Sequence, residues 1–368
     1  TARERFLGIA QGDVRGALYL PYNLNYSWFM PETVERWHAE GLPEDADIAE
    51  HLGLDPIAFT GGGPYELVPP FETQVLHEDD ETQTVRDEAG VTKRVFKQHT
   101  QSKMPQWLDY PVKTRQDFDE LRRRLDPESA SRYPADWDAF ADRWQSRDIP
   151  LGLGPGSFYG HTLQRWVGTE RLCMLFYDAP QFVHEMLDRL EWFFLELLKR
   201  FLDPASPLAG RVRFDFASFG EDIAFKGRTF LSPDMFRRFI QPHYVSICDL
   251  LRRHGIEVIF VDSDGYLNEL IPLWLEVGIN GFSPLEVAAG MDALALKREY
   301  GDDIVLAGNI DKRSLIVGGE AIDAEVEKVR RLLDLGGFLS AVDHSVPPDV
   351  PYDNFRRLVE GLRDCTAT

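Results

Sequence analysis

The chain has 368 residues, of which 43% are hydrophobic, so it can fold around a full-sized core, and a disordered chain is excluded. The formal net charge of −21 repels phosphate backbones. We therefore expect no nucleic-acid partner, and a polyanionic substrate only where basic side chains gather at the site. The three cysteines form no CxxC pair, which argues against a disulfide framework and against a thiolate zinc knuckle.

No run of apolar residues approaches the roughly 18 that a membrane-spanning helix needs. The most apolar stretch, residues 192–198, is interrupted by Glu196. The first residues also lack the apolar core and the small-residue cleavage site of a secretory signal. A cytoplasmic protein without a membrane span is therefore the expectation.

Two weak strand candidates, residues 17–20 and 56–59, come first along the chain. Residues 61–148 are charged and weakly periodic, and we interpret them as an insertion that covers the mouth of a barrel. Within it, residues 82–100 are typical of a hairpin that turns at Glu88-Ala89-Gly90. From about residue 150, β-rich runs alternate with amphipathic helical stretches such as 179–201, 233–254 and 322–333. The β-rich runs are residues 149–154, 212–219, 256–261, 279–282, 304–307 and 338–342.

This alternation is typical of repeated βα units around a parallel sheet. The six clear units and the two weaker strands together predict a single (β/α)₈ barrel that spans residues 1–368. An open, doubly wound sheet of six strands fits the same pattern. In a barrel of this kind the working site lies where the strands end, so polar residues at those positions are the candidates for chemistry.

The segment Val261-Asp262-Ser263-Asp264-Gly265 follows one of these strands. Side chains two apart on an extended segment point the same way, so Asp262 and Asp264 can present two carboxylates to one point. Two such carboxylates favour a cation or a shared proton between them. The alternative is structural, with Asp264-Gly265 forming a turn and Asp262 capping the next helix.

His344 follows the last strand and precedes a rigid Val346-Pro347-Pro348 stretch. Its imidazole could bind a metal or move a proton beside Asp262 and Asp264. A structural histidine bonded to a loop carbonyl is the alternative.

Glu221-Asp222 and Glu286 occupy the same position after their own strands, and each of these residues could be a ligand, a general acid or base, or a helix cap. Glu286 is also a candidate substrate contact. His161 lies at a further strand exit and could contact substrate. A nicotinamide cofactor is not expected, because Ser157 stands where the third glycine of GxGxxG belongs.

An aromatic and amide-rich segment near the N-terminus is a candidate for the substrate pocket. It combines the rings of Tyr22, Tyr26 and Trp28 with the amides of Asn23 and Asn25. Such a set suits a flat, weakly polar ligand, although a buried junction between a strand and a helix would look the same.

Taken together, several motifs resemble the uroporphyrinogen decarboxylase superfamily, which also contains corrinoid-linked methyltransferases. The resemblance implies a (β/α)₈ barrel and is strongest over residues 150–362. Residues 104–108 with 111–114 are similar to the methyltransferase branch. The motifs are Trp166-Val167-Gly168-Thr169-Glu170, Gly220-Glu221-Asp222, Asp262-Ser263-Asp264-Gly265, Gly308-Asn309-Ile310-Asp311 and His344-Ser345-Val346-Pro347-Pro348-Asp349.

The decarboxylases of this superfamily hold an octacarboxylate with an arginine-rich N-terminal loop, whereas residues 22–28 contain no arginine. The methyltransferases bind zinc through a His-x-Cys pair and a distant cysteine. In this chain Asp262 and Asp264 match the pair, and His344 falls at or near the distant position. The resemblance therefore implies a divalent metal, zinc first and Mn²⁺ or Fe²⁺ next, held by Asp262, Asp264 and His344 with Glu221 as a further ligand.

The leading hypothesis is a methyltransferase that moves a methyl group between a small methylated substrate and a corrinoid carried by a partner protein. One alternative is a metal-free decarboxylase in which Asp262 or Asp264 stabilises a protonated intermediate and His344 donates a proton. Another is a barrel that binds a tetrapyrrole or corrinoid without catalysis. The oligomeric state stays open, with a homodimer as one option.

Overall fold

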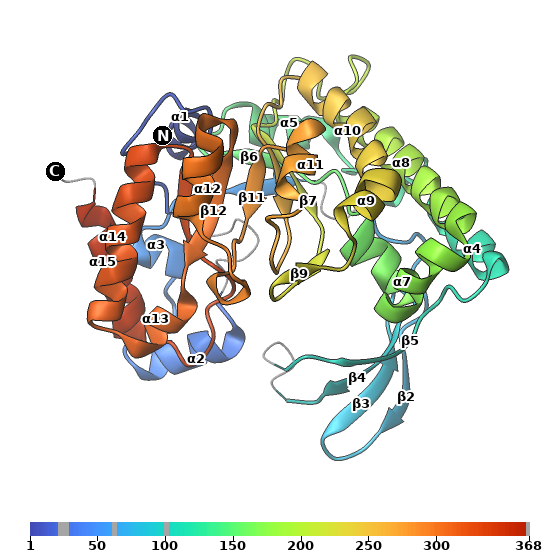
Figure 1. The fold of residues 1–368 in the computed structure, drawn as a ribbon, viewed down its shortest axis with the longest axis horizontal. Coiled ribbons are helices and arrows are strands. Elements are labelled where there is room, and N and C mark those ends of the chain that lie inside the picture. Colours follow the sequence, from blue (N-terminus) through green and yellow to red (C-terminus); the bar gives the residue numbers. More distant parts are fainter. Residues whose placement is uncertain (21–28, 61–64, 99–102, 366–368) are drawn as a thin grey trace.

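A curled sheet of seven parallel strands forms the centre of the protein (Figure 1). The computed structural model describes residues 1–20, 29–60, 65–98 and 103–365. The strands lie in the order β1-β6-β7-β10-β11-β12-β13, so their order across the sheet follows their order along the chain. They are β1 (Ala58–Thr60), β6 (Leu151–Leu153), β7 (Phe216–Gly220), β10 (Ile259–Asp262), β11 (Gly281–Ser283), β12 (Val305–Ile310) and β13 (Phe338–Val342).

Helices cover the outer face of this sheet (Figure 1). The longest, α8, begins at Pro180, whose fixed φ suits the first helical position, and buries an apolar stripe that includes Phe182, Met186 and Leu190. The helices are α1 (Ala2–Ala10), α2 (Pro31–Ala39), α3 (Ile48–Leu52), α4 (Arg115–Leu121), α5 (Trp137–Gln145), α6 (Gln164–Val167), α7 (Thr169–Asp178), α8 (Pro180–Leu202), α9 (Pro233–Met235), α10 (Gln241–Arg253), α11 (Ile271–Glu276), α12 (Ala293–Tyr300), α13 (Lys312–Val317), α14 (Glu320–Leu335) and α15 (Tyr352–Asp364).

The predicted eighth strand is the main departure from the expected barrel. Residues 17–20 are described and form no strand, so β1 and β13 remain the two edges of the sheet. Tyr19 Oη donates to the carbonyl of Pro56, and the amide of Leu20 donates to the side chain of Asp55. The segment is thus held by side-chain bonds near β1 rather than by a strand ladder. The architecture is a barrel-like α/β fold built on seven described strands.

An apolar plug fills the amino-terminal end of the curled sheet. Side chains alternate along each strand, and Phe216 and Phe260 belong to one buried cluster with Phe6 and Ile9 of α1. The Phe260 ring leaves no room on the neighbouring strand, because a Cβ at Gly281 would lie 2.5 Å from it. The interior at the amino-terminal ends of the strands is thus filled by apolar side chains.

A four-stranded antiparallel sheet projects from the barrel-like body (Figure 1). The predicted hairpin is present as its central pair, and Gly90 in the turn has a φ of 82°, which glycine tolerates. Two flanking strands that the sequence did not reveal complete the sheet. Its strands are β2 (Gln74–Glu78), β3 (Thr82–Arg86), β4 (Thr92–Phe96) and β5 (Gln106–Asp109), and a separate short ribbon pairs β8 (Ala224–Phe225) with β9 (Arg228–Thr229).

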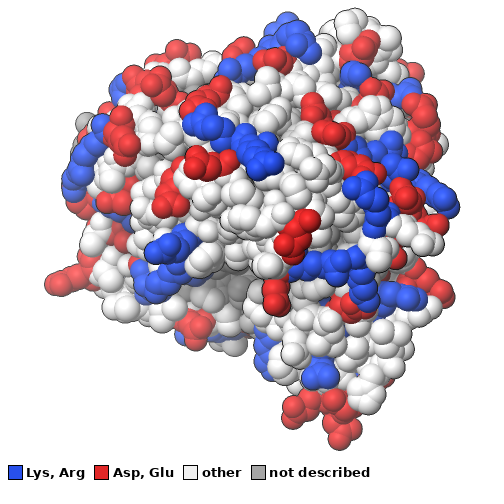
Figure 2. All heavy atoms as spheres, turned by 45° about the vertical axis from the view of Figure 1, so that its right-hand side comes forward, with Lys and Arg blue, Asp and Glu red and all other residues white. Residues whose placement is uncertain are grey.

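The surface carries charges of both signs. On the face in Figure 2, Lys and Arg side chains are interspersed with Asp and Glu, and no broad patch of positive charge stands out. Within the described residues, every helix is too short or too polar to cross a bilayer.

Candidate functional site

Acidic side chains and one imidazole meet at the carboxyl-terminal ends of the strands. Asp264 follows β10, Glu286 follows β11 and His344 follows β13. His344 Nε2 lies 3.3 Å from Asp264 Oδ2, and one ligand atom from each of these residues lies within 4.8 Å of the others. We call Asp264, Glu286 and His344 the acidic triad. Its donor set, two carboxylates and an imidazole, matches the ligands that divalent transition metals use in proteins.

The electrostatics of the acidic triad favour a bound cation. Burial, and then the neighbouring charge of Asp264, raise the pKa of Glu286. The Gly265 amide donates to Glu286 Oε2 over 3.0 Å, and Lys312 Nζ lies 3.8 Å from Glu286 Oε1. Both contacts lower the pKa of Glu286 and so offset part of the rise. The Oδ1 atom of Asp264 is buried and accepts no hydrogen bond from any described residue. A cation among these oxygens would contact the Asp264 Oδ1 lone pair, for which no described residue supplies a donor.

Of the two aspartates predicted to act together, Asp264 belongs to the triad and Asp262 does not. Asp262 ends β10, is almost fully buried, and its backbone carbonyl accepts a 2.6 Å hydrogen bond from the amide of Glu221. Glu286, predicted as a substrate contact, supplies the second carboxylate of the triad.

Glu221, predicted as a further ligand, is used by the protein in another way. Its side chain is fully buried and accepts hydrogen bonds from the amides of Phe158 (2.5 Å) and Tyr159 (2.7 Å) and from Tyr244 Oη (2.8 Å). Burial raises the pKa of Glu221 to about 7, although these donors pull in the opposite direction. Glu221 therefore fixes the turn after β6 and contributes no ligand atom to the acidic triad.

The neighbouring Asp222, named with Glu221 as a possible ligand, acid or base, or helix cap, does reach the site. Its Oδ1 accepts a hydrogen bond of 3.4 Å from the amide of Asp264, and its Oδ2 lies 3.5 Å from His161 Nε2. Burial raises the pKa of Asp222, His161 lowers it, and the charge of Asp264 raises it again. The pair Glu221-Asp222 was visible in the sequence, but nothing there indicated which member faces the mouth.

A cavity of about 330 Å³ adjoins this cluster at the ends of β6 and β7. His161, predicted as a substrate contact, lines the cavity and bonds to Asp222, so it lies between the cavity and the acidic triad. Small residues, Gly154, Ser218 and Gly220, form part of the wall. The volume suits a small ligand.

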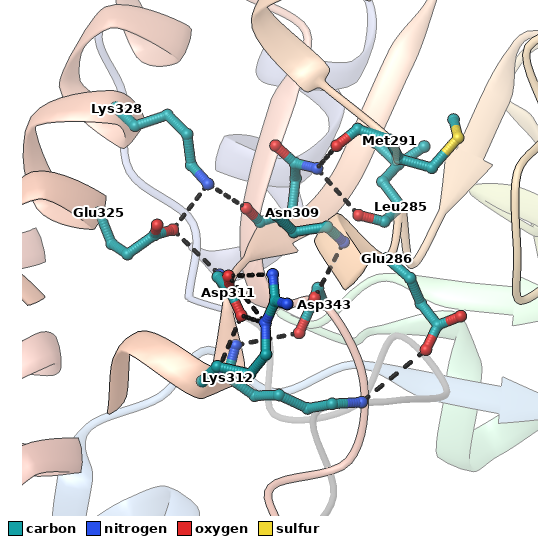
Figure 3. Close-up of polar contacts among 11 residues, drawn as sticks. Leu285, Glu286, Met291, Asn309, Asp311, Lys312, Glu325, Lys328 and Asp343 are labelled. Atoms are coloured by element: carbon teal, nitrogen blue, oxygen red, sulfur yellow. Dashed lines mark hydrogen bonds and ion pairs between the residues drawn. The ribbon is translucent and has the colours of Figure 1, made fainter. Parts of the chain in front are cut away.

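The loop that carries Glu286 is held by Asn309 (Figure 3). Asn309 Nδ2 donates to the carbonyls of Leu285 (2.8 Å) and Met291 (3.1 Å), and Asn309 Oδ1 accepts from the amide of Ala293 (3.2 Å). Asn309 has a φ of 62°, a left-handed conformation that asparagine tolerates better than most residues. The Gly308-Asn309 motif therefore supports the loop that carries Glu286.

Asp343, beside His344, ties three strand ends together (Figure 3). Its carboxylate accepts from the amides of Val287 (3.0 Å) and Lys312 (3.1 Å), which follow Glu286 and β12. Burial raises the pKa of Asp343, while the Lys312 contacts lower it. Such outer contacts fix the orientation of the groups that bind a metal.

A second group of possible metal ligands, Asp188, Glu191 and His243, lies between α8 and α10. His243 Nδ1 is 2.6 Å from Glu191 Oε2, and Ser246 also donates to Glu191. These contacts of Glu191 on α8 with His243 and Ser246 on α10 explain why the side chains lie together. The remaining predicted substrate contacts, Tyr22, Asn23, Asn25, Tyr26 and Trp28, lie outside the described residues.

Among solved structures, the chain is similar to a methyltransferase from Methanosarcina mazei, with a TM-score of 0.56 and 16% sequence identity. The match covers 99% of this chain and 98% of that one, so the two share a fold.

Two curated relatives are uroporphyrinogen decarboxylases. The one from Acidiphilium cryptum (strain JF-5) is 29% identical over 135 residues, which is 36% of this chain and 37% of the relative. The one from Jannaschia sp. (strain CCS1) is 26% identical over 83 residues, 23% of this chain and 24% of the relative. The matches thus span 37% of the length of the first relative and 24% of the length of the second.

The sequence model of the uroporphyrinogen decarboxylase family matches residues 162–365, which is more than half of the chain. The matched range includes Asp222 and the acidic triad. This protein belongs to the uroporphyrinogen decarboxylase family.

Proposed function

We propose that this protein is a methyltransferase in which the acidic triad holds a divalent metal and the adjoining cavity binds a small methylated substrate. The methyl group moves to or from a corrinoid carried by a separate protein. The observation that carries the proposal is the approach of Asp264, Glu286 and His344, from three different loops, to within 4.8 Å of one another.

The donor set of the acidic triad fits such a metal. One imidazole and two carboxylates suit zinc first, and also Mn²⁺ or Fe²⁺. The raised pKa of Glu286 and the open lone pair on Asp264 Oδ1 both favour a cation at this point. Compared with the ligand set expected from the sequence, the proposed set keeps Asp264 and His344, adds Glu286 and leaves out Asp262 and Glu221.

When bound, the metal would act as a Lewis acid on the heteroatom that bears the methyl group, which makes that heteroatom a better leaving group. The chain supplies the rest. The cavity holds the substrate beside the acidic triad, and the backbone amide of Gly265 keeps Glu286 in position. His161, held by Asp222, can give a proton to the departing heteroatom as the methyl group leaves.

The direct test is metal binding. Protein stripped with a chelator and titrated with Zn²⁺ in a calorimeter should bind one equivalent tightly, and His344→Ala and Asp264→Asn should each lose it. Glu191→Gln is the matched control, because it removes a ligand from the second group of possible ligands and should leave this binding unchanged. No binding to the stripped protein, or loss in Glu191→Gln alone, would overturn the assignment.

A second candidate is decarboxylation of a small acid without metal. The observation that favours it is the contact between an imidazole and a carboxylate, His344 with Asp264, which could donate and stabilise a proton. Release of carbon dioxide from candidate acids by stripped protein would distinguish it from methyl transfer. Tight corrinoid binding without turnover in either assay would instead favour a binding protein.

A further inference from the structure

The cavity beside the acidic triad carries few charges on its walls. Its charged lining residues within the described part of the chain are Glu66, Glu88 and Arg165, together with His161, which can be charged. Arg165 comes from α6, whereas Glu66 lies between β1 and β2 and Glu88 lies in the turn between β3 and β4. Arg165 thus supplies the strongly basic group at this cavity.

Arg165 has no partner within the described chain. It is exposed, and none of its nitrogens forms a hydrogen bond or ion pair with any described residue. The nearby Arg171 is different, because it donates to the backbone carbonyl of Lys113. A guanidinium that faces a cavity without a partner presents a planar pair of donors, which is the geometry that binds a carboxylate.

The two glutamates limit how many anionic groups the cavity can take. A ligand with one carboxylate can pair with Arg165, but a second carboxylate would face Glu66 or Glu88 without a counter-ion. The walls therefore favour a monoanion over a polycarboxylate.

Aromatic side chains on the walls favour a flat ligand. Tyr65 lines the cavity and is held edge-on against Phe194, with ring centroids 5.3 Å apart. Trp166 lines it as well, and its carbonyl accepts a 2.9 Å hydrogen bond from the amide of Val112. Gly154 lies beside the Tyr65 ring, because a Cβ added there would be at an ordinary contact distance of 3.7 Å from it. Rigid rings beside a small cavity select planar molecules.

We propose that Arg165 binds the carboxylate of the substrate, and that the substrate is a small, flat monocarboxylate. The methylated group then lies at the His161 end of the cavity, next to Asp222 and the acidic triad. The orientation of the methyl group rests on the proposed methyl transfer, whereas the carboxylate contact does not need it.

The test uses 4-methoxybenzoate as the probe, with 4-methoxybenzamide as its uncharged match and methoxyacetate as a smaller acid. Binding to metal-stripped protein is measured by calorimetry for wild type, Arg165→Met and Arg165→Lys. Wild type should bind 4-methoxybenzoate about tenfold more tightly than the amide, because hydrogen bonds to a charged group are the stronger ones. Arg165→Met should lose this preference, and Arg165→Lys should keep part of it.

The control is Arg213→Gln, which removes an exposed arginine near the opposite end of β7 and should leave the preference unchanged. Equal binding of acid and amide by wild type, an unchanged preference in Arg165→Met, or no binding of either acid at millimolar concentration would each overturn the inference. Because the protein is stripped of metal, failure here is separate from failure of the metal site.

Discussion

His344 Nε2 lies 3.3 Å from Asp264 Oδ2, so the loop after β13 meets the loop after β10 at one point. Contact between these two loops requires the sheet to curl, because β10 and β13 are separated by β11 and β12 in the sheet order. The curl brings Glu286 of the intervening loop to the same point. The acidic triad is therefore a product of the tertiary fold and of no single sequence segment.

Glu286→Gln should weaken metal binding strongly and leave the fold intact. The amide keeps one oxygen to accept from Gly265 but loses the charge that a cation requires. We expect the metal affinity to fall by about a hundredfold, at the upper end of what changes around a metal site cause. Calorimetric titration with Zn²⁺, with circular dichroism to check the fold, measures the effect.

Metal affinity should also rise with pH above the usual glutamate pKa. The pKa of Glu286 is raised, so protons compete with the metal at this carboxylate further up the pH scale than at an ordinary acid. A titration series at increasing pH should give a steep rise for wild type and a shallower one for Glu286→Gln. Equal slopes for the two proteins would contradict the role of Glu286.

Glu221→Gln should destabilise the protein without removing the metal. A Gln side chain would turn its NH₂ group toward the donors of one carboxylate oxygen, either the Phe158 amide and Tyr244 Oη or the Tyr159 amide. A buried mismatch of this kind costs about 1–3 kcal/mol. Denaturant unfolding with parallel metal titration measures both effects, and Tyr244→Phe, which removes one donor, should cost less. Loss of metal in Glu221→Gln with unchanged stability would restore Glu221 as a ligand.

Glu221 also makes stability depend on pH. Its pKa rises from an ordinary 4.5 to about 7 on folding, so the folded state holds a proton that the unfolded state releases. The stability from this proton is fully present below pH 4.5 and is lost as pH rises through 7. The stability advantage of wild type over Glu221→Gln should therefore shrink across that window in a series of unfolding curves.

The strand ends were predictable because a buried parallel strand is a short apolar run, and polar residues mark where it stops. Which of two adjacent polar residues faces the mouth was not predictable. Asp262 is the last residue of β10, so the strand alternation that was meant to align it with Asp264 no longer applies beyond it. Glu221 accepts hydrogen bonds from the turn after β6, whereas its neighbour Asp222 faces the site. These outcomes depend on hydrogen-bond partners from distant segments, which a single sequence does not display.

Gly308→Ala should prevent normal folding of the site. Gly308 has a φ of 104°, and a Cβ there would lie 1.9 Å from the carbonyl oxygen of Pro284. Gly210→Ala is the matched control, because Gly210 also has a positive φ of 71° but has nothing within 4 Å of an added Cβ. The control should lose about 1 kcal/mol, the cost of the left-handed conformation alone. Thermal unfolding should separate the two variants clearly, and similar melting temperatures would show that the loop after β12 can relax.

His161→Asn should slow turnover without releasing the metal. His161 lies between the cavity and Asp222, where it can hold the proton that a departing heteroatom needs, and asparagine cannot donate that proton as an acid. Loss of a general acid costs about 10²–10⁴ in rate. The effect should fall on kcat rather than on metal affinity, and it should be smaller for substrates whose leaving group is acidic enough to depart without a proton. An equal loss for good and poor leaving groups would assign His161 to substrate binding and remove it from proton transfer.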